Sequence, residues 1–264
     1  MKKISIITVS YNSANTIKDT LESVLYQNYS DIEHIIIDGA STDNTLDILE
    51  KLQHPRLRVF SGKDRGIYDA MNKGILKAKG DIIAFLNADD WYVSHDVLSN
   101  VARQFKKDLD YLYADLDFVD DNYRVRRTWQ DQNHSVSDVL RWGWQPAFPT
   151  MFFNRRLFNN PGFKFNQAFS ISGDYDFLVR LHQMKSLNIL YLPNLLVHMR
   201  LGGASTSGIR AILKSNYQAL IILKRVGVIF PPWVVALKIT RKFAQLFKRP
   251  QEKYASFYWE HDKT

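Results

Sequence analysis

The chain has 264 residues, of which 45% are hydrophobic and 13% aromatic, and its formal net charge is +8. This apolar content is enough to bury a core of ordinary size, so the composition excludes a chain that is disordered throughout. The absence of cysteine excludes a disulfide scaffold, a thiol nucleophile and cysteine-ligated zinc. Together with the absence of a signal-peptide pattern, it predicts a cytoplasmic protein.

The positive charge is concentrated toward the C-terminal end of the chain. Residues 203–253 contain ten basic residues and one acid, a charge of +9, whereas residues 1–202 sum to zero. A positive charge spread over the whole chain would suggest a nucleic-acid binder. A neutral body followed by a basic segment suggests docking to an anionic surface instead, so we expect no nucleic-acid partner.

The first 90 residues alternate short apolar runs with helical patterns. Runs rich in Ile and Val predict buried parallel strands, and apolar residues at i, i+4 and i+7 predict the helices between them. The expected strands are residues 4–9, 32–37, 57–60 and 81–86, and the expected helices lie within 17–25, 46–52 and 67–78. This β-α-β-α-β-α-β order predicts a parallel sheet with right-handed crossovers.

The sequence after residue 90 is less regular. Residues 111–119 and 123–129 predict a hairpin, residues 147–153 a further strand, and residues 173–185 a helix. Because no repeat or low-complexity linker interrupts this part, we expect one continuous α/β domain up to residue 207.

Polar clusters follow each of the four strands predicted in the first 90 residues. They occupy residues 8–12, 38–43, 63–66 and 87–90. Ligands bind beyond the carboxyl ends of parallel strands, so we expect these clusters to converge on one site. The chain has neither a G-x-G-x-x-G motif after its first strand nor a Walker A lysine loop, which disfavours a dinucleotide oxidoreductase and a P-loop NTPase.

Asp38 ends a run of isoleucines, which delivers its carboxylate to the edge of the sheet. There it can accept a hydrogen bond from a ligand, for example from the imide N–H of uracil. The spacing equally allows Asp38, Ser41 and Asp43 merely to form the turn and cap the next helix.

Asn87, Ala88, Asp89 and Asp90 follow the last of these strands. Adjacent carboxylates that face a pocket repel each other unless a cation lies between them. A divalent ion that also binds substrate phosphates, and so neutralises a diphosphate leaving group, is the functional interpretation. A solvated turn is the alternative.

Two further positions in the second half can carry chemistry. Asp174 lies in the first turn of a predicted helix, either as a general base or as a capping acid. His198 and Arg200 precede a small-residue loop that begins at Gly202 and Gly203. His198 can be a metal ligand or a structural histidine, and Arg200 can clamp a diphosphate.

Taken together and in this order, these clusters resemble the family-2 glycosyltransferases, and in particular the small bacterial members that build surface polysaccharides. The resemblance extends from about residue 3 to residue 207. It rests on TVSYN at 8–12, DGASTDNT at 38–45, DRGIYDAMNKG at 64–74, NADD at 87–90 and SGDYD at 172–176.

This resemblance implies an α/β GT-A (Rossmann-like) fold, with a mixed, mainly parallel sheet and flanking helices. It implies inverting transfer of a hexosyl or N-acetylhexosaminyl group from a nucleotide sugar, usually a UDP-sugar, with Mn²⁺ or Mg²⁺. Residues 1–90 would form the nucleotide-binding half and residues 91–207 the acceptor-side half. The expected product is a surface polysaccharide such as lipopolysaccharide or capsule.

The resemblance also assigns roles to individual residues. The nucleotide-sugar site would comprise Thr8, Ser10, Tyr11, Asn12, Asp38, Asp64, Arg65, Asn87, Ala88, Asp89 and Arg200. The metal would be held by Asp89, Asp90 and His198, and Asp174 would be the catalytic base. Asn87 stands where the family's D-x-D element begins with Asp, which weakens its expected contact and leaves Asp89 and Asp90 as the metal candidates.

Residues 208–264 are expected to form a basic amphipathic helical tail. Prolines 231, 232 and 250 bracket a helix with one apolar and one basic face. The apolar face would comprise Val235, Ala236, Ile239, Phe243, Leu246 and Phe247, and the basic face Lys238, Arg241, Lys242, Lys248 and Arg249. Residues 231–250 therefore suit the anionic inner face of the cell membrane, where a lipid-linked saccharide acceptor would be met, but they cannot span it.

Two alternatives remain from the sequence. The basic helix can pack on the catalytic domain with a solvated basic face. The whole chain can be a non-catalytic nucleotide-sugar-binding scaffold of a polysaccharide assembly complex, although such a scaffold need not keep Asp174, Asp89 and Asp90 together.

Overall fold

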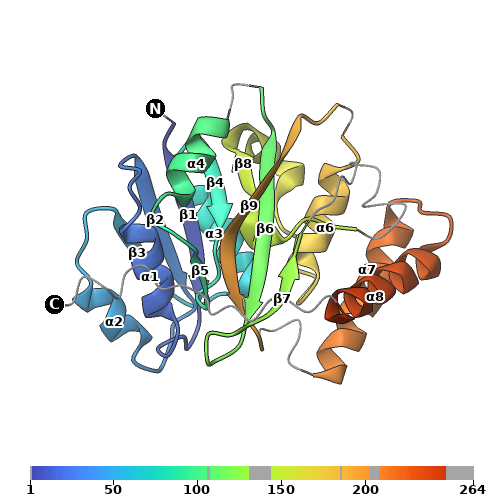
Figure 1. Ribbon diagram of the computed structural model, residues 1–264, viewed down its shortest axis with the longest axis horizontal. Coiled ribbons are helices and arrows are strands. Elements are labelled where there is room, and N and C mark those ends of the chain that lie inside the picture. The colour runs from blue at the N-terminus through green and yellow to red at the C-terminus, as the bar shows by residue number, and fades with distance from the viewer. Residues whose placement is uncertain (1, 106–107, 131–143, 185, 203–207, 248–264) are drawn as a thin grey trace.

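A mixed β-sheet runs through the centre of the molecule, with helices on both faces (Figure 1). The structure is a computed structural model, and it describes residues 2–105, 108–130, 144–184, 186–202 and 208–247. Within these residues the sheet has nine strands, eight of them in the order β3-β2-β1-β4-β8-β6-β9-β5, with β7 paired to β6.

The elements follow one another as expected in the first half and less regularly afterwards. The strands are β1 (Ile4–Ser10), β2 (Ile32–Asp38), β3 (Leu57–Ser61), β4 (Ile82–Phe85), β5 (Asp90–Tyr92), β6 (Tyr111–Val119), β7 (Val125–Trp129), β8 (Phe152–Asn154) and β9 (Ile189–Arg200). The α-helices are α1 (Ile17–Leu25), α2 (Thr45–Lys51), α3 (Ile67–Lys77), α4 (Val97–Gln104), α6 (Gly173–Leu181), α7 (Ile209–Arg225) and α8 (Pro231–Phe247). Short 3₁₀ turns cover η1 (Phe148–Thr150), η2 (Arg155–Asn159) and η3 (Pro161–Phe163).

The first half confirms the predicted parallel sheet. Strand β1 pairs in parallel with β2 and with β4, and β2 pairs in parallel with β3. The second half adds β8, which is antiparallel to both β4 and β6, and β9, which is parallel to β6 and antiparallel to β5. The result is the mixed α/β sheet that the sequence predicts.

Alternate side chains of the central strands enter two separate cores, because successive residues of a strand point to opposite faces. Ile7 and Phe85 pack on one face with α3, α6, α7 and α8, whereas Ile6 and Ala84 pack on the other face with α4 and part of α1. Helix α3 lies directly on β1 at Gly74, where a Cβ atom would come within 2.4 Å of Ile7 Cγ2.

Two local predictions were wrong. Residues 147–153 were expected to form one strand, but the chain forms the 3₁₀ turn η1 before the short strand β8. Pro149 has no amide proton for a ladder, and the Thr150 hydroxyl donates to the Ala114 carbonyl at 2.9 Å, which holds the turn against β6. The helix expected over 173–185 ends at Leu181, after which the buried His182 ring bonds the Tyr111 hydroxyl at 2.5 Å.

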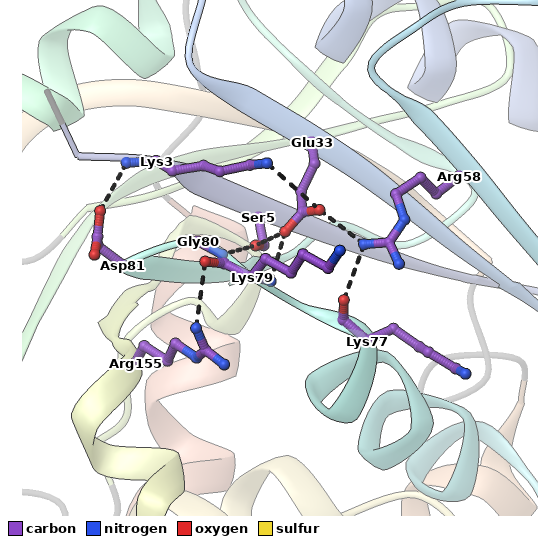
Figure 2. A network of polar contacts seen from close by, with 9 residues as sticks. All are labelled: Lys3, Ser5, Glu33, Arg58, Lys77, Lys79, Gly80, Asp81 and Arg155. Carbon is purple, nitrogen blue, oxygen red and sulfur yellow. Dashed lines mark hydrogen bonds and ion pairs between the residues drawn. The ribbon is translucent and has the colours of Figure 1, made fainter.

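A buried carboxylate ties the amino ends of the central strands together (Figure 2). Glu33 accepts hydrogen bonds from the Ser5 hydroxyl at 2.7 Å, the Lys79 amide at 2.6 Å and the Arg58 guanidinium at 2.8 Å. Lys3 adds an ion pair at 3.8 Å. Burial alone would raise the pKa of Glu33, but these partners together hold that pKa below its usual value.

Replacing this carboxylate should destabilise the fold. We expect Glu33→Gln to lower the free energy of unfolding at neutral pH by about 2 kcal/mol, because the partly exposed Arg58 and Lys3 keep their charges and lose their partner. A group with a lowered pKa loses its contribution as the pH falls through that pKa, so the difference should shrink in acid. Urea unfolding at several pH values measures it. Glu22→Gln, which removes the i,i+4 partner of the exposed Lys18, is the control and should change stability by less than about 0.5 kcal/mol. Equal effects of the two substitutions would contradict a buried role for Glu33.

The described part of the predicted tail packs on the body. Figure 1 shows α7 and α8 beside α6, at the end of the molecule away from α2. Ile222 and Leu223 of α7 and Val234 and Val235 of α8 are buried in the same core as Tyr175 of α6. This is the packed alternative that the sequence left open. Residues 248–264, and the side chains of residues 241–247, lie outside what the structure describes.

Candidate active site

Three of the predicted clusters meet at the carboxyl edge of β1, β2 and β3. The Asn12 amide oxygen accepts from the Thr42 N–H at 2.9 Å, and the Asn12 N–H donates to the Ser41 hydroxyl at 2.9 Å. A Cβ atom on Gly39 would lie 2.7 Å from the Asp64 carboxylate and 3.4 Å from the Tyr11 ring. The loops after these strands therefore form one continuous rim.

The rim presents an aromatic and a cationic side chain to solvent. The Tyr11 side chain is 62% exposed, so its ring offers a flat surface on which a base can stack. Asp64 accepts from the Gly66 N–H at 2.8 Å, and the exposed Arg65 guanidinium lies 3.5 Å from Asp69. An exposed aromatic ring and an exposed guanidinium on the same rim suit an aromatic, anionic ligand.

Asp38 adopts the turn-forming role that the sequence left open. The side chain is completely buried, and its two oxygens accept from the Ser10 hydroxyl at 3.1 Å, the Ser41 amide at 2.9 Å, the Ser41 hydroxyl at 2.5 Å and the Ser61 hydroxyl at 2.9 Å. A carboxylate has about four acceptor sites, so these donors saturate it. The hydrogen bonds of Asp38 therefore hold the loops of the rim in place. A uracil N–H could bond to Asp38 only by displacing one of these donors.

Thr8 is not placed to contact a ligand with its side chain. It is completely buried, and its hydroxyl lies 2.9 Å from Nε2 of the equally buried His34. Because β1 is covered on both faces, residue 8 faces the interior.

The Asn87–Asp90 cluster is divided between surface and interior. Asp90 is completely buried and accepts from the Asn87 amide at 2.8 Å, while its other oxygen has no hydrogen-bond partner. Burial, reinforced by the neighbouring Asp89 carboxylate, raises the pKa of Asp90 well above its usual value. Ala88 packs beneath α1, which leaves the half-buried Asn87 and Asp89 nearest the surface.

The metal trio expected from the sequence is not assembled. In the part of the chain that the structure describes, no group of three or more His, Cys, Asp or Glu side chains could together hold a metal ion. His198 is buried in β9 with its ring 5.5 Å from that of Trp91, and burial lowers its pKa to about 4. Strand β9 continues to residue 200, so His198 lies inside the sheet and not in a loop.

Asp89 remains the best-placed carboxylate for a metal. Mg²⁺ and similar hard ions are commonly bound by one or two carboxylates and completed by water and substrate phosphates. A half-buried carboxylate just after β4, the strand that pairs with β1, fits that pattern. The fully buried Asp90 does not.

Arg200 is anchored inside the protein. Its guanidinium pairs with Asp19 at 2.9 Å and lies 5.2 Å from the ring centroids of both Trp91 and Tyr123. These contacts hold the guanidinium at the end of β9, where its positive charge also acts on Asp89, and its role as a diphosphate clamp stays a prediction. The loop that begins at Gly203 lies outside the described residues.

Asp174 lies in the first turn of α6 and is held by a side chain from α3. The Tyr68 hydroxyl donates to the Ile171 carbonyl at 2.6 Å and lies 3.2 Å from Asp174 Oδ1. A Cβ atom on Gly173 would come within 2.7 Å of the Tyr68 ring, so glycine is what allows this packing. Burial raises the pKa of Asp174, and the Tyr175 amide and Lys238 oppose that shift in part. A carboxylate with a raised pKa is suited to general-base chemistry near neutral pH.

Residues 5–173 match the family described as Glycosyl transferase family 2. The chain belongs to glycosyl transferase family 2. It is therefore a nucleotide-sugar-dependent glycosyltransferase, as the motifs predicted.

Two glycosyltransferases illustrate which proteins this chain resembles in sequence. The chain is 31% identical over 193 residues to the PGL/p-HBAD biosynthesis glycosyltransferase of Mycobacterium bovis (strain BCG / Pasteur 1173P2), covering 71% of this chain and 73% of that protein. It is 39% identical over 102 residues to the Escherichia coli UDP-Glc:alpha-D-GlcNAc-diphosphoundecaprenol beta-1,3-glucosyltransferase WfaP, covering 38% of this chain and 41% of that protein.

Solved structures share the GT-A fold. TarS 1-349 of S. aureus in complex with UDP-GlcNAc superposes with a TM-score of 0.67 at 18% identity, over 92% of this chain and 73% of that chain. The mannosyltransferase PcManGT of Pyrobaculum calidifontis in complex with GDP-Man and Mn²⁺ gives a TM-score of 0.62 at 17% identity, over 95% and 76%.

Sequence reasoning about this family-2 member missed two residues that hold Asp174 and the start of α6 in place. Tyr68 lies in the DRGIYDAMNKG stretch, but no role was assigned to it. Gln218 of α7 accepts from the backbone N–H groups of Ile171 and Ser172 at 3.2 and 3.0 Å, which fixes the start of α6. An isolated Gln in an amphipathic helix gives no sequence signal of such a contact.

Proposed function

We propose that this enzyme is an inverting glycosyltransferase. It transfers a sugar from a UDP-sugar to a hydroxyl group of a lipid-linked saccharide during surface-polysaccharide synthesis. The observation that carries the proposal is Asp174, a half-buried carboxylate with a raised pKa that lies 3.2 Å from the Tyr68 hydroxyl. The names of relatives such as WfaP support the choice of a UDP-sugar donor and a diphosphate-lipid acceptor.

In the proposed reaction, Asp174 takes the proton of the acceptor hydroxyl while that oxygen attacks the anomeric carbon. The bond from that carbon to the diphosphate oxygen breaks on the opposite side, and UDP leaves with the bonding electrons. Attack opposite the leaving group inverts the anomeric configuration. Mn²⁺ or Mg²⁺, held by Asp89, would supply positive charge for the leaving diphosphate.

The rim formed by Tyr11, Asn12, Gly39, Asp64 and Arg65 is the proposed nucleotide site. Tyr11 offers a stacking face, and Arg65 offers a cation at the same edge. Asp38 and Ser10 hold the rim in shape. Asn87 and Asp89 lie after β4, the strand that pairs with β1, and therefore border the same edge of the sheet.

A panel of nucleotide sugars tests the proposal. The purified enzyme is supplied with Mn²⁺, a synthetic diphosphate-lipid-linked N-acetylglucosamine and one donor at a time, with GDP-mannose as the mismatched donor. We expect UDP release and a product one sugar heavier, as measured by mass spectrometry, with at least one UDP-sugar. Failure of every nucleotide sugar to bind, even with the metal present, would overturn the proposal.

We further propose that the enzyme docks on the membrane through the turn between α7 and α8. Ile229 is fully exposed, and Phe230 and Trp233 are 63% and 55% exposed. The exposed Lys224 and Arg225 immediately precede this turn. Apolar and aromatic side chains next to basic ones suit an anionic bilayer surface. Among the described residues there is no helix of the length and hydropathy that a membrane span requires.

This docking surface differs from the apolar face predicted from the sequence, since Val235 of that face is buried in the core. We expect the double variant Phe230→Ser, Trp233→Ser to bind vesicles containing phosphatidylglycerol about tenfold more weakly than the unmodified chain. Tyr26→Ser, which removes an equally exposed aromatic from the end of α1, is the matched control and should bind normally. Co-sedimentation measures both, and unchanged binding of the double variant would exclude this surface.

A further inference from the structure

Helix α8 places the positively charged Lys238 against Tyr175, the residue that follows the proposed base Asp174. The Lys238 ammonium lies 4.2 Å from the centroid of the Tyr175 ring, and Tyr175 is the residue next to Asp174. Val234 and Val235, one turn earlier in α8, are 4% and 6% exposed and pack in the core with α6 and α7. The position of Lys238 is therefore fixed by buried contacts, and not by a solvated helix face as the helical wheel predicted.

In the described part of the chain, two ionisable side chains from other elements act on Asp174. The Tyr68 hydroxyl of α3 lies 3.2 Å from its Oδ1, and the positive charge of Lys238, which lies on the adjacent Tyr175 ring, acts on it from α8. Asp176, on α6 itself, is paired with Arg180 at 2.8 Å. The α7 side chains bonded around the start of α6, Ser215 and Gln218, are uncharged. Burial disfavours the ionised form of Asp174, and the positive charge of Lys238 favours it.

We infer that Lys238 is a positioning residue of the transfer reaction, whose ammonium keeps the Asp174 carboxylate in the ionised form that accepts the acceptor's proton. This inference rests on the proposed role of Asp174 as the base. Lys238 lies outside residues 5–173, the part of the chain that matches the family. The C-terminal helices would thus contribute to catalysis as well as to docking.

A purely structural role for Lys238, as a cation packed on the Tyr175 ring, makes a different prediction. Loss of packing lowers the amount of folded enzyme or its rate at every pH. Loss of a charge beside the base moves the pH at which the base becomes ionised. The pH profile of kcat/KM therefore separates the two roles.

The test compares Lys238→Met, which keeps the aliphatic stem, with Lys238→Arg, which keeps the charge. For Lys238→Met we expect the acidic limb of kcat/KM to move to higher pH, with the alkaline plateau within about threefold of the unmodified enzyme. Lys238→Arg should keep its limb near the original position. Lys51→Met, which removes one positive charge from α2 at the other end of the molecule, is the control and should leave the limb unchanged.

Two results would overturn the inference: a Lys238→Met limb that coincides with that of the unmodified enzyme, or equal shifts in Lys238→Met and Lys238→Arg. If Lys238→Met does not fold, Lys238→Gln replaces it in the same comparison. Asp174→Asn separates this inference from the proposed function. An active Asp174→Asn would overturn both, whereas an inactive Asp174→Asn with an unshifted Lys238→Met limb would overturn only the role of Lys238.

Discussion

Asp174→Asn is expected to lower kcat/KM for sugar transfer about a thousandfold, because general-base catalysis contributes a factor of this order. The variant keeps the size of the side chain and can still bond to Tyr68, so folding and UDP binding should be preserved. UDP release gives the rate, and calorimetry gives the UDP affinity. Asp176→Asn is the matched control, since this acid of the same helix turn pairs with Arg180 and should affect stability more than rate.

The pH dependence gives the same assignment an independent check. Burial raises the pKa of Asp174 above the usual value for an aspartate. A base acts only when ionised, so activity should fall as the pH is lowered, and the fall should begin at a higher pH than an ordinary exposed aspartate would give. Asp174→Asn activity close to that of the unmodified enzyme would show that another group takes the proton.

A chain that ends at Gly208 is expected to lose its cooperative fold. The truncation removes four large buried side chains, Ile222, Leu223, Val234 and Val235. Burial of each stabilises a fold by roughly 1.5–3 kcal/mol, so together they approach the whole stability of a typical domain. It also removes the Gln218 bonds to the start of α6.

Thermal unfolding followed by near-ultraviolet circular dichroism measures this loss. A chain that ends at Phe247 keeps both α7 and α8 and is the control; it should unfold cooperatively near the temperature of the full chain. If the chain that ends at Gly208 also unfolded cooperatively and bound UDP, residues 208–264 would not be needed for the fold or for the nucleotide site.

The parallel half of the fold could be predicted because its signals are local. The spacing of Ile17, Leu21, Val24 and Leu25 indicates which face of α1 is buried, and all four are buried. The second half depends on pairings between distant segments, such as β9 with β6, whose order no local pattern specifies. The insertion of the three-residue strand β8 between β4 and β6 is of this kind.

The site could be located from the sequence more reliably than its residues could be assigned. Parallel strands bring the loops with Tyr11, Gly39 and Asp64 together, and this follows from topology alone. Whether a side chain in a strand points to a ligand or into a core depends on what covers each face. Thr8 and His198 lie in covered strands, which the residue types at those positions do not reveal.

Helix α8 illustrates the same limit. A helical wheel separates the apolar residues from the basic ones, but it does not say what packs against either face. The structure places Val235 in the core and Lys238 on the Tyr175 ring. The distinction matters because the helical wheel alone assigns the apolar face of α8 to a membrane, whereas the structure packs Val235 of that face in the core.

The anomeric configuration of the product tests the proposed mechanism most directly. With a UDP-α-hexose that the donor panel identifies, proton NMR of the new glycosidic linkage distinguishes α from β. Attack assisted by Asp174 on the face opposite UDP predicts a β-linked product that is not formed at a comparable rate by Asp174→Asn. An α-linked product would contradict single-step inverting transfer with Asp174 as the base.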